Sequence, residues 1–268
     1  MTKPRAYKPA LIDETSLGAA VRKLPRLSRV RYMPVVSSTN ACAFEVLNSN
    51  DSLGISFVTE SQEQGRGRAG RHWICPPAAG VLISTILPAD IPNAALPAAG
   101  FWTALAVMQA VRDTCGVELQ PKWPNDLLLG TGKCAGILAQ SRSSGGSSRV
   151  IVGVGINANR PEDLAYDMPE GAAWLSDAAG RIVDRTALIA ALLHNYEDAF
   201  DWLLARPQDA IQRWAAQAQL VGKHVSVRGL DGRAAYEGTA RGISAEGALL
   251  LDTAGGGVAV TLGDVQVL

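Results

Sequence analysis

Residues 65–71 place three arginines and three glycines within seven positions, in a chain whose formal net charge is +0. Glycine lets the backbone lie close to a ligand, and the planar guanidinium of arginine binds a carboxylate or phosphate through paired hydrogen bonds. This composition predicts a loop that holds an anion. For the segment taken alone, the alternative is a solvated basic surface loop.

The same segment contains a dinucleotide-binding pattern. Gly65, Gly67 and Gly70 are spaced as GxGxxG, and Asp90 follows Gly70 by twenty positions. A Rossmann fold requires a helix that opens at this loop and faces the pyrophosphate. The residues that follow include Pro76-Pro77, where no helix is expected, because proline lacks the backbone donor. We therefore exclude a Rossmann site.

A second charged motif, KWPND at positions 122–126, sets a lysine beside a tryptophan and a rigid proline. A compact ammonium held in this way could neutralise a phosphoryl oxygen as charge builds in a transition state. The alternative is a strand-end lysine beside an Asn-Asp turn, because both of those residues favour turns. Lys133 is a third candidate cation, for which an ordinary surface position is the alternative.

The run GVGIN at 153–157 ends a predicted buried strand. Its glycines would allow another backbone or a planar ligand to approach closely, and packing against a neighbouring strand explains them equally well. The sequence has no GxxxxGK[ST] phosphate loop, no GxSxG nucleophile motif and no histidine pair at metal-ligand spacing. A site rich in cations and poor in bases suits an anionic nucleophile, such as a carboxylate that attacks the α-phosphate of ATP.

The elements that position these motifs follow from hydrophobic periodicity and turn residues. Strands are predicted at 31–36, 55–59, 81–87, 127–129, 135–139 and 149–156. Helices are predicted from the capping residues 37–40 to about Asn48, at 97–115, from Asp184 through Leu203, and around Ile211 and Trp214. Residues 143–148 are expected to be a flexible connector. Short loops between consecutive strands predict an at least partly antiparallel sheet.

Three segments are expected: a basic N-terminal segment at 1–30, a catalytic domain at 31–220 and a small β-barrel at 221–268. The barrel is predicted from short β runs separated by glycine-containing turns. Residues 1–31 carry eight Lys/Arg against Asp13 and Glu14, and we expect them to be mobile or loosely docked.

The bulk composition, 47% hydrophobic and 19% charged over 268 residues, is that of a globular protein with one large domain and a small appendage. No signal peptide is recognisable, and no apolar run is expected to reach membrane-spanning length. Four cysteines without paired spacing, Cys42, Cys75, Cys115 and Cys134, predict reduced thiols rather than disulfides or a zinc site. We expect a cytoplasmic protein with no membrane partner.

Taken together and in order, five motifs resemble those of the biotin protein ligases: SSTN at 37–40, Gln62 followed by GRGRAGRHW at 65–73, KWPND at 122–126, GKCAGIL at 132–138 and GVGIN at 153–157. The resemblance covers about residues 31–268, since 240–243 and 247–251 also fit the family's C-terminal domain. It implies an α+β fold: a mixed β-sheet backed by helices, like the catalytic domain of class II aminoacyl-tRNA synthetases, followed by a small Src-homology-3-like barrel.

The resemblance also implies a reaction. Biotin and Mg-ATP would give biotinyl-5′-AMP and pyrophosphate, and biotin would then pass to one lysine of the biotin carboxyl carrier domain of an acyl-CoA carboxylase. ATP with its Mg²⁺ and biotin are thus implied as substrates, with no tightly bound prosthetic group. The metal ligands are left unknown.

Family roles fall on matching residues of this chain. Lys122, Arg66 and Arg68 are implied as catalytic. Biotin binding is implied for Ser38, Thr39, Asn40, Gln62, Gly65, Arg66, Gly67, Arg68, Trp73, Lys122 and Gly136. ATP binding is implied for Arg66, Arg68, Arg71, Lys122, Asn125, Lys133, Asn157 and Trp174, the last by stacking on adenine. The loop at 65–73 is expected to close over the reactive adenylate and exclude water.

Some family members carry an N-terminal helix-turn-helix that represses biotin synthesis genes. Here about thirty residues precede the first catalytic strand, with Pro4, Pro9 and Pro25 among them. We therefore expect a monofunctional ligase with no specific nucleic-acid partner, although basic residues allow weak nonspecific attraction to DNA. A lipoate or octanoyl transferase and a catalytically inactive biotin- or nucleotide-binding regulator are the competing functions. A homodimer is compatible with the sequence.

Overall fold

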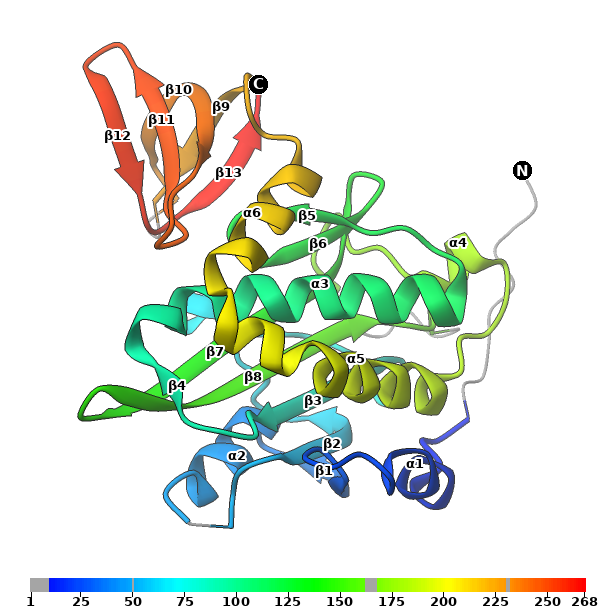
Figure 1. The fold of residues 1–268 in the computed structure, drawn as a ribbon. Coiled ribbons are helices and arrows are strands. Elements are labelled where there is room, and N and C mark those ends of the chain that lie inside the picture. Colours follow the sequence, from blue (N-terminus) through cyan, green and yellow to red (C-terminus); the bar gives the residue numbers. More distant parts are fainter. Residues whose placement is uncertain (1–9, 50, 162–167, 230–231) are drawn as a thin grey trace.

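The computed structural model describes residues 10–49, 51–161, 168–229 and 232–268 (Figure 1). Its larger sheet has the strand order β1-β2-β3-β8-β7-β6-β5, with β4 paired to β8. These strands are β1 Arg29–Val36, β2 Ile55–Gln62, β3 Gly80–Ile86, β4 Ile91–Pro92, β5 Gln120–Lys122, β6 Asp126–Leu129, β7 Gly132–Ser144 and β8 Ser147–Asn157. Among the strand pairs of the described residues only β1–β2 is parallel, which confirms the prediction of a mixed sheet.

Helices cover both faces of this sheet. They are α1 Glu14–Val21, α2 Thr39–Val46, α3 Leu96–Cys115, α4 Leu175–Ala179, α5 Arg185–Ala205 and α6 Pro207–Ala218, with short 3₁₀ turns η1 Arg68–Gly70 and η2 Asn93–Ala95. Neighbouring residues of β2 contribute to different faces of the sheet, because successive side chains of a strand point in opposite directions. Val58 packs in the core that holds α3 and α5, whereas Phe57 packs with Ala43 and Leu47 around α2.

Helix α3 is the centre of the larger core. Trp102 of α3 stacks on Tyr196 of α5, and Phe101 meets the edge of Trp214 of α6. Residues 93–115 are long and apolar enough, by length and composition, to cross a membrane, contrary to the expectation from sequence. However, 67% of its most apolar stretch is buried inside the protein, as expected for a core helix.

The N-terminal segment is part of the catalytic domain over its described residues, and the expectation of a mobile or loosely docked segment is wrong there. Asp13 caps α1, and Leu17, Val21 and Leu27 are buried at 0–1% exposure. The Glu197 carboxylate of α5 accepts hydrogen bonds from the Leu27 backbone N–H and from the Arg26 side chain. Apolar side chains lie between the basic residues and are buried against the domain. The count of charges alone did not predict that this segment docks. The prediction for residues 1–9 lies outside the described residues.

The serine-rich segment at 143–148 is a hairpin turn and not a flexible connector. Strands β7 and β8 pair up to Ser144 and Ser147, and Gly145 takes the turn with φ +63°. The Ser143 and Ser148 hydroxyls lie 2.7 Å apart, so cross-strand pairing extends the sheet through a sequence of low hydrophobicity.

The C-terminal segment forms a separate antiparallel sheet in the order β12-β11-β10-β9-β13. Its strands are β9 His224–Arg228, β10 Ala234–Ile243, β11 Leu249–Thr253, β12 Gly256–Val260 and β13 Asp264–Val267. It contacts the catalytic domain where the buried Trp123 indole donates to the Gly247 carbonyl at 3.0 Å. A Cβ at Gly247 would lie 2.6 Å from the Phe101 ring, so this turn packs closely against α3.

Candidate functional site

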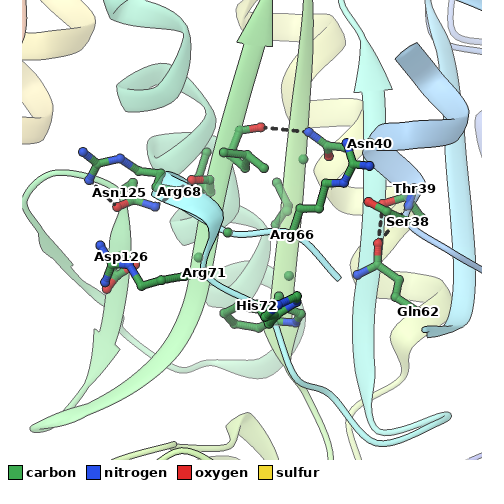
Figure 2. Close-up of a pocket in the computed structure, with 18 of the residues that line it drawn as sticks. Ser38, Thr39, Asn40, Gln62, Arg66, Arg68, Arg71, His72, Asn125 and Asp126 are labelled. Carbon is green, nitrogen blue, oxygen red and sulfur yellow. Dashed lines mark hydrogen bonds between the residues drawn. The ribbon is translucent and has the colours of Figure 1, made fainter. Parts of the chain in front are cut away.

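A pocket lies on the α2 face of the large sheet, between the start of α2 and the arginine loop, which we define as residues 65–73 (Figure 2). Twelve of the residues implied by sequence line it: Ser38, Thr39, Asn40, Gln62, Arg66, Gly67, Arg68, Arg71, Trp73, Asn125, Lys133 and Gly136. They come from segments far apart in the chain, so the fold brings together motifs that were recognised separately.

One end of the pocket is polar and uncharged. Ser38, Thr39 and Asn40 stand at the N-terminus of α2 and are all at least 96% buried. Thr39 donates through its backbone N–H and its hydroxyl toward Gln62 Oε1, at 2.8 and 3.1 Å. The capping residues predicted from sequence therefore also form a binding surface.

The Asn40 side chain crosses strand β8 at Gly153. Its Nδ2 donates to Gln140 Oε1 at 2.9 Å and to the Leu138 carbonyl at 3.4 Å, both on β7. Its Oδ1 accepts from the Ser84 hydroxyl of β3 at 2.6 Å. A Cβ at Gly153 would lie 1.9 Å from this oxygen, so only glycine leaves space for the amide.

The indole of Trp73 covers two other glycines of the sheet floor. A Cβ at Gly155 would lie 2.4 Å from Trp73 Cε2, and one at Gly136 would lie 3.0 Å from its ring. The sequence left open whether the glycines of GVGIN served a ligand or a neighbouring strand. In the structure they make room for the side chains of Asn40 and Trp73, which themselves line the pocket.

The other end of the pocket is cationic. The arginine loop folds on itself, with the Gly67 N–H bonded to the Arg71 carbonyl at 2.7 Å and Ala69 and Gly70 at φ 54° and 76°. The loop forms a short 3₁₀ turn followed by extended chain, and not an α-helix, which agrees with the exclusion of a Rossmann site.

Arg68 donates to Asn125 Oδ1 at 3.1 Å, and burial lowers the pKa of its guanidinium below the usual value. Within the described part of the chain, neither Arg66 nor Arg68 forms an ion pair with a carboxylate. A partly desolvated cation without a counter-ion favours an anionic ligand.

Lys133 and Asp126 form the wall beside the arginines. Lys133 Nζ lies 2.7 Å from Asp126 Oδ1 and 5.6 Å from the centroid of the Trp73 ring. This placement supports a site position for Lys133 over the surface alternative. Asp126, which was expected from sequence only as a turn residue, also lines the pocket.

Four implied site residues do not line the pocket. Gly65 closes the base of the loop, where its carbonyl accepts from the Trp73 N–H at 2.9 Å, and any side chain there would meet the Trp73 carbonyl. Asn157 is buried at the end of β8, and its Nδ2 donates to the Lys133 carbonyl at 3.3 Å. Its Oδ1 has no partner among the described residues.

Trp174 is 2% exposed and lies at the N-terminus of α4, so its ring is inside the protein and outside the pocket lining. The placement does not support adenine stacking, because the preceding segment is held against Lys133 by two backbone hydrogen bonds. Lys122 is also outside the lining, but it pairs across the sheet with Asp126. Directly opposed residues of antiparallel strands share a face, with Cβ atoms about 5 Å apart. Lys122 therefore lies beside the pocket wall, directly opposite Asp126 on the neighbouring strand.

Seven lining residues were not assigned from sequence: His72, Asp126, Ile137, Leu138, Gly153, Val154 and Gly155. All of them belong to motifs that had been recognised, so motif membership was the available signal. Ser84 and Gln140, which hold Asn40 from behind, lie in no motif and could not have been found in this way.

Comparison with known proteins identifies the family of the chain. The Biotin/lipoate A/B protein ligase family model matches residues 32–157, and the Biotin protein ligase C terminal domain model matches residues 220–268. The biotin--[acetyl-CoA-carboxylase] ligase of Mycobacterium tuberculosis is 33% identical, covering 88% of each chain. The bifunctional ligase/repressor BirA of Bacillus subtilis is 32% identical over 97% of this chain and 80% of its own.

A solved structure, the Aquifex aeolicus biotin protein ligase in complex with biotin and ATP, has a TM-score of 0.70 at 23% identity, covering 90% of this chain and 98% of that chain. At this identity the likeness concerns the fold. The two sequence relatives named above both exceed 30% identity over most of their length, and they establish the kinship. The chain belongs to the biotin protein ligase family.

Proposed function

We propose that this pocket activates biotin with ATP to form biotinyl-5′-AMP and that the chain then transfers biotin to a lysine of a biotin carboxyl carrier domain. The observation that carries the proposal is the polarity of the pocket. Uncharged hydrogen-bonding groups of Thr39, Asn40 and Gln62 and the cationic side chains of Arg66 and Arg68 line the same pocket on one sheet face.

This polarity matches biotin, which has a neutral cyclic urea at one end and a carboxylate at the other. Hydroxyl and amide groups supply donors and acceptors for the urea, and the Trp73 ring supplies an apolar wall. The arginines hold the carboxylate and the α-phosphate close together, so that positioning and charge neutralisation lower the barrier to attack. No general base is needed because the nucleophile is already ionised.

Residues at the cationic end are proposed to hold the nucleotide. Arg71, Asn125 and Lys133 contact the phosphates or ribose, and Lys122 approaches the reacting carboxylate from the neighbouring strand. Asn157 supports Lys133 from below through its backbone carbonyl.

The Mg²⁺ of Mg-ATP enters with its substrate. Magnesium retains several waters and binds through one or two carboxylates together with the phosphates of the nucleotide. Asp126 is the carboxylate among the residues that line the pocket and is held toward it by Lys133. The described residues contain no cluster of three acidic, histidine or cysteine ligands, which fits a metal held mainly by the nucleotide.

Biotin-dependent exchange of labelled pyrophosphate into ATP tests this function, because it requires the first half-reaction alone. We expect exchange with biotin and none with lipoate. Exchange with lipoate but not biotin would favour the lipoate branch of the family, and biotin binding with no exchange would favour an inactive regulator. Labelling of a purified carrier domain then tests the second half-reaction.

The acceptor is proposed to be the carrier domain of an acetyl-CoA carboxylase, because the Mycobacterium tuberculosis and Paracoccus denitrificans relatives are both named biotin--[acetyl-CoA-carboxylase] ligases. We further propose a class II synthetase-like relationship for the large sheet, a Src-homology-3-like one for the C-terminal sheet, and a cytoplasmic location.

We also propose that the chain does not bind a specific operator. Support comes from residues 10–30, whose one helix docks on α5 and belongs to the catalytic core. A gel-shift assay at several salt concentrations tests this, and sequence-specific binding that persists at high salt would contradict it.

A further inference from the structure

The transfer of biotin to a lysine has a chemical requirement that the activation of biotin lacks. In the activation step the nucleophile is a carboxylate, which already carries the electron pair that attacks. The acceptor lysine is an ammonium at neutral pH, with three donors and no lone pair. It must lose a proton before its nitrogen can form a bond to carbon, so the transfer step requires a base beside the reacting carbonyl.

The titratable side chains that line the pocket are those of Arg66, Arg68, Arg71, His72, Asp126 and Lys133. Protonated arginine and lysine have no acceptor for a further proton. The Asp126 carboxylate is a weak base and is occupied by Lys133 at 2.7 Å. His72 remains, and no hydrogen bond or ion pair joins its imidazole to another of the described residues, whereas His194 and His224 are bonded far from the pocket.

The backbone places His72 directly beside Arg66. The two residues form an antiparallel bridge across the arginine loop, and backbone hydrogen bonds of 2.7 and 2.9 Å flank the bridge one residue away on each side. This is the pattern of a non-hydrogen-bonded pair, in which the Cα atoms lie about 4.5 Å apart and both side chains share a face. Arg66 is proposed to hold the biotin carboxylate, so the imidazole stands beside the acyl group (Figure 2).

A second cavity borders the same loop. It is lined by Gln64, residues 66–72, Leu138 and Gln140, and His72 and Arg66 line both cavities. The residues proposed to bind the urea, Thr39, Asn40 and Gln62, line only the first. His72 is exposed to solvent. The imidazole therefore lies where a route open to another protein meets the place of the bound adenylate.

We propose that His72 is the general base of the transfer step and takes a proton from an acceptor lysine that enters through the second cavity. The inference rests on the proposed function. The ammonium gives one proton to the imidazole and then attacks. The C–N bond forms, the bond from the acyl carbon to the phosphate oxygen breaks, and AMP leaves with that electron pair. The new amide nitrogen releases its second proton to solvent.

The test separates the two half-reactions in His72→Gln, which keeps a polar side chain that cannot take up a proton. Pyrophosphate exchange should stay within about twofold of the native rate, because activation uses no base. For transfer, biotinyl-5′-AMP is formed on the protein, pyrophosphate is removed, and a carrier domain is added in a single turnover. Mass spectrometry of the carrier should show transfer slowed by about 100-fold at neutral pH.

The dependence of the transfer rate on pH distinguishes a base from a residue that only shapes the loop. In the native protein the rate should level off once the imidazole is neutral. In His72→Gln it should keep rising by about tenfold per pH unit toward pH 10, because only lysine that has lost its proton to solvent attacks. The charged groups around the imidazole are common to both proteins: Arg66, Arg68 and Arg71 on its own loop, Asp126 on β6 and Lys133 on β7.

His224→Gln is the matched control. His224 is an exposed histidine on the C-terminal sheet, bonded to Glu237, and its replacement should leave both half-reactions and the pH profile unchanged. In His72→Ala, added imidazole should restore at least about tenfold of the lost transfer rate, because a free base then occupies the vacated space.

Transfer at the native rate in His72→Gln would overturn the proposal. Equal losses of exchange and transfer, or a slowed transfer whose pH profile stays parallel to the native one, would show a role in loop shape and overturn it as well. Intact exchange with unaffected transfer sinks this inference alone, whereas a native protein without biotin-dependent exchange sinks the proposed function too.

Discussion

Arg71 of the arginine loop forms an ion pair with Asp264 of β13, with Nη1 and Oδ2 2.8 Å apart. The pair joins the loop over the pocket to the C-terminal sheet, across almost two hundred residues of sequence. Its side chains are 50% and 41% exposed, so its contribution to global stability is small, about 1 kcal/mol or less. Its expected importance lies in holding the loop closed.

Asp264→Ala is therefore expected to free the loop without unfolding the protein. Amide exchange at residues 65–73 should become faster, and KM for ATP should rise by a few-fold, with a change in unfolding free energy below about 1 kcal/mol. Asp252→Ala, which breaks the exposed Arg241–Asp252 pair within the C-terminal sheet, is the control and should change neither property. Loop exchange that is equal in both variants would argue against the contact between loop and sheet.

The arginine loop should be ordered by the adenylate. Arg66 and Arg68 have no carboxylate partner in the described structure, so a bound phosphate and acyl group would supply the missing anion. We expect exchange at residues 65–73 to slow by at least about tenfold when biotinyl-5′-AMP is bound. Equal protection with and without the adenylate would mean that the loop is not a lid.

The proposed roles of Lys122 and Lys133 can be distinguished by mutation. Lys122→Ala should lower pyrophosphate exchange by at least about 100-fold if its ammonium meets the developing charge, with little loss of stability. Lys133→Ala should mainly raise KM for ATP, and it also releases Asp126. Lys223→Ala, a substitution at an exposed position, is the control. Near-normal exchange in Lys122→Ala would transfer the proposed role to Lys133.

Gly155→Ala should damage biotin binding through Trp73. The new methyl group would lie 2.4 Å from Trp73 Cε2, so the indole must move from its place in the pocket wall. We expect biotin affinity to fall at least about tenfold, by calorimetry. Gly146→Ala, in the hairpin turn with nothing within 4 Å of the added Cβ, should bind biotin normally. Normal binding by both variants would remove Trp73 from the biotin site.

Cys134 should make stability fall at alkaline pH. Burial raises the pKa of this fully buried thiol from 9.0 to about 12 in the native state, whereas the unfolded chain loses the proton near 9. The contribution of Cys134 to the free energy of unfolding is therefore constant below pH 9. It decreases between pH 9 and about pH 12, by up to about 1.4 kcal/mol per pH unit.

Chemical denaturation of Cys134→Ala between pH 8 and 11 checks this effect, because the substitution should flatten the alkaline slope even though it lowers stability at neutral pH. Cys42→Ala, at a half-buried thiol, should leave more of the slope in place. A slope that is unchanged in Cys134→Ala would assign the alkaline loss of stability to other groups.

The local part of this protein could be predicted from sequence. The bounds of helix α3 could be predicted because they depend on local features: its apolar periodicity and Gly116, which ends the helix at φ +68°. The site motifs could be found for the same reason: clustered arginines, capping hydroxyls and strand glycines each signal their chemistry locally. Twelve implied residues line one pocket.

Tertiary structure decided what depends on partners distant in sequence. The N-terminal segment docks because Glu197 and the α5 surface receive it, which a charge count over residues 1–31 cannot reveal. Gly153 leaves space for the Asn40 side chain, and the Ser84 hydroxyl contacts Thr39 although the two residues are 45 positions apart in the sequence. The sequence alone thus determined which chemistry the pocket offers. The fold decided which atoms meet, because strand register is set by pairing across the whole sheet.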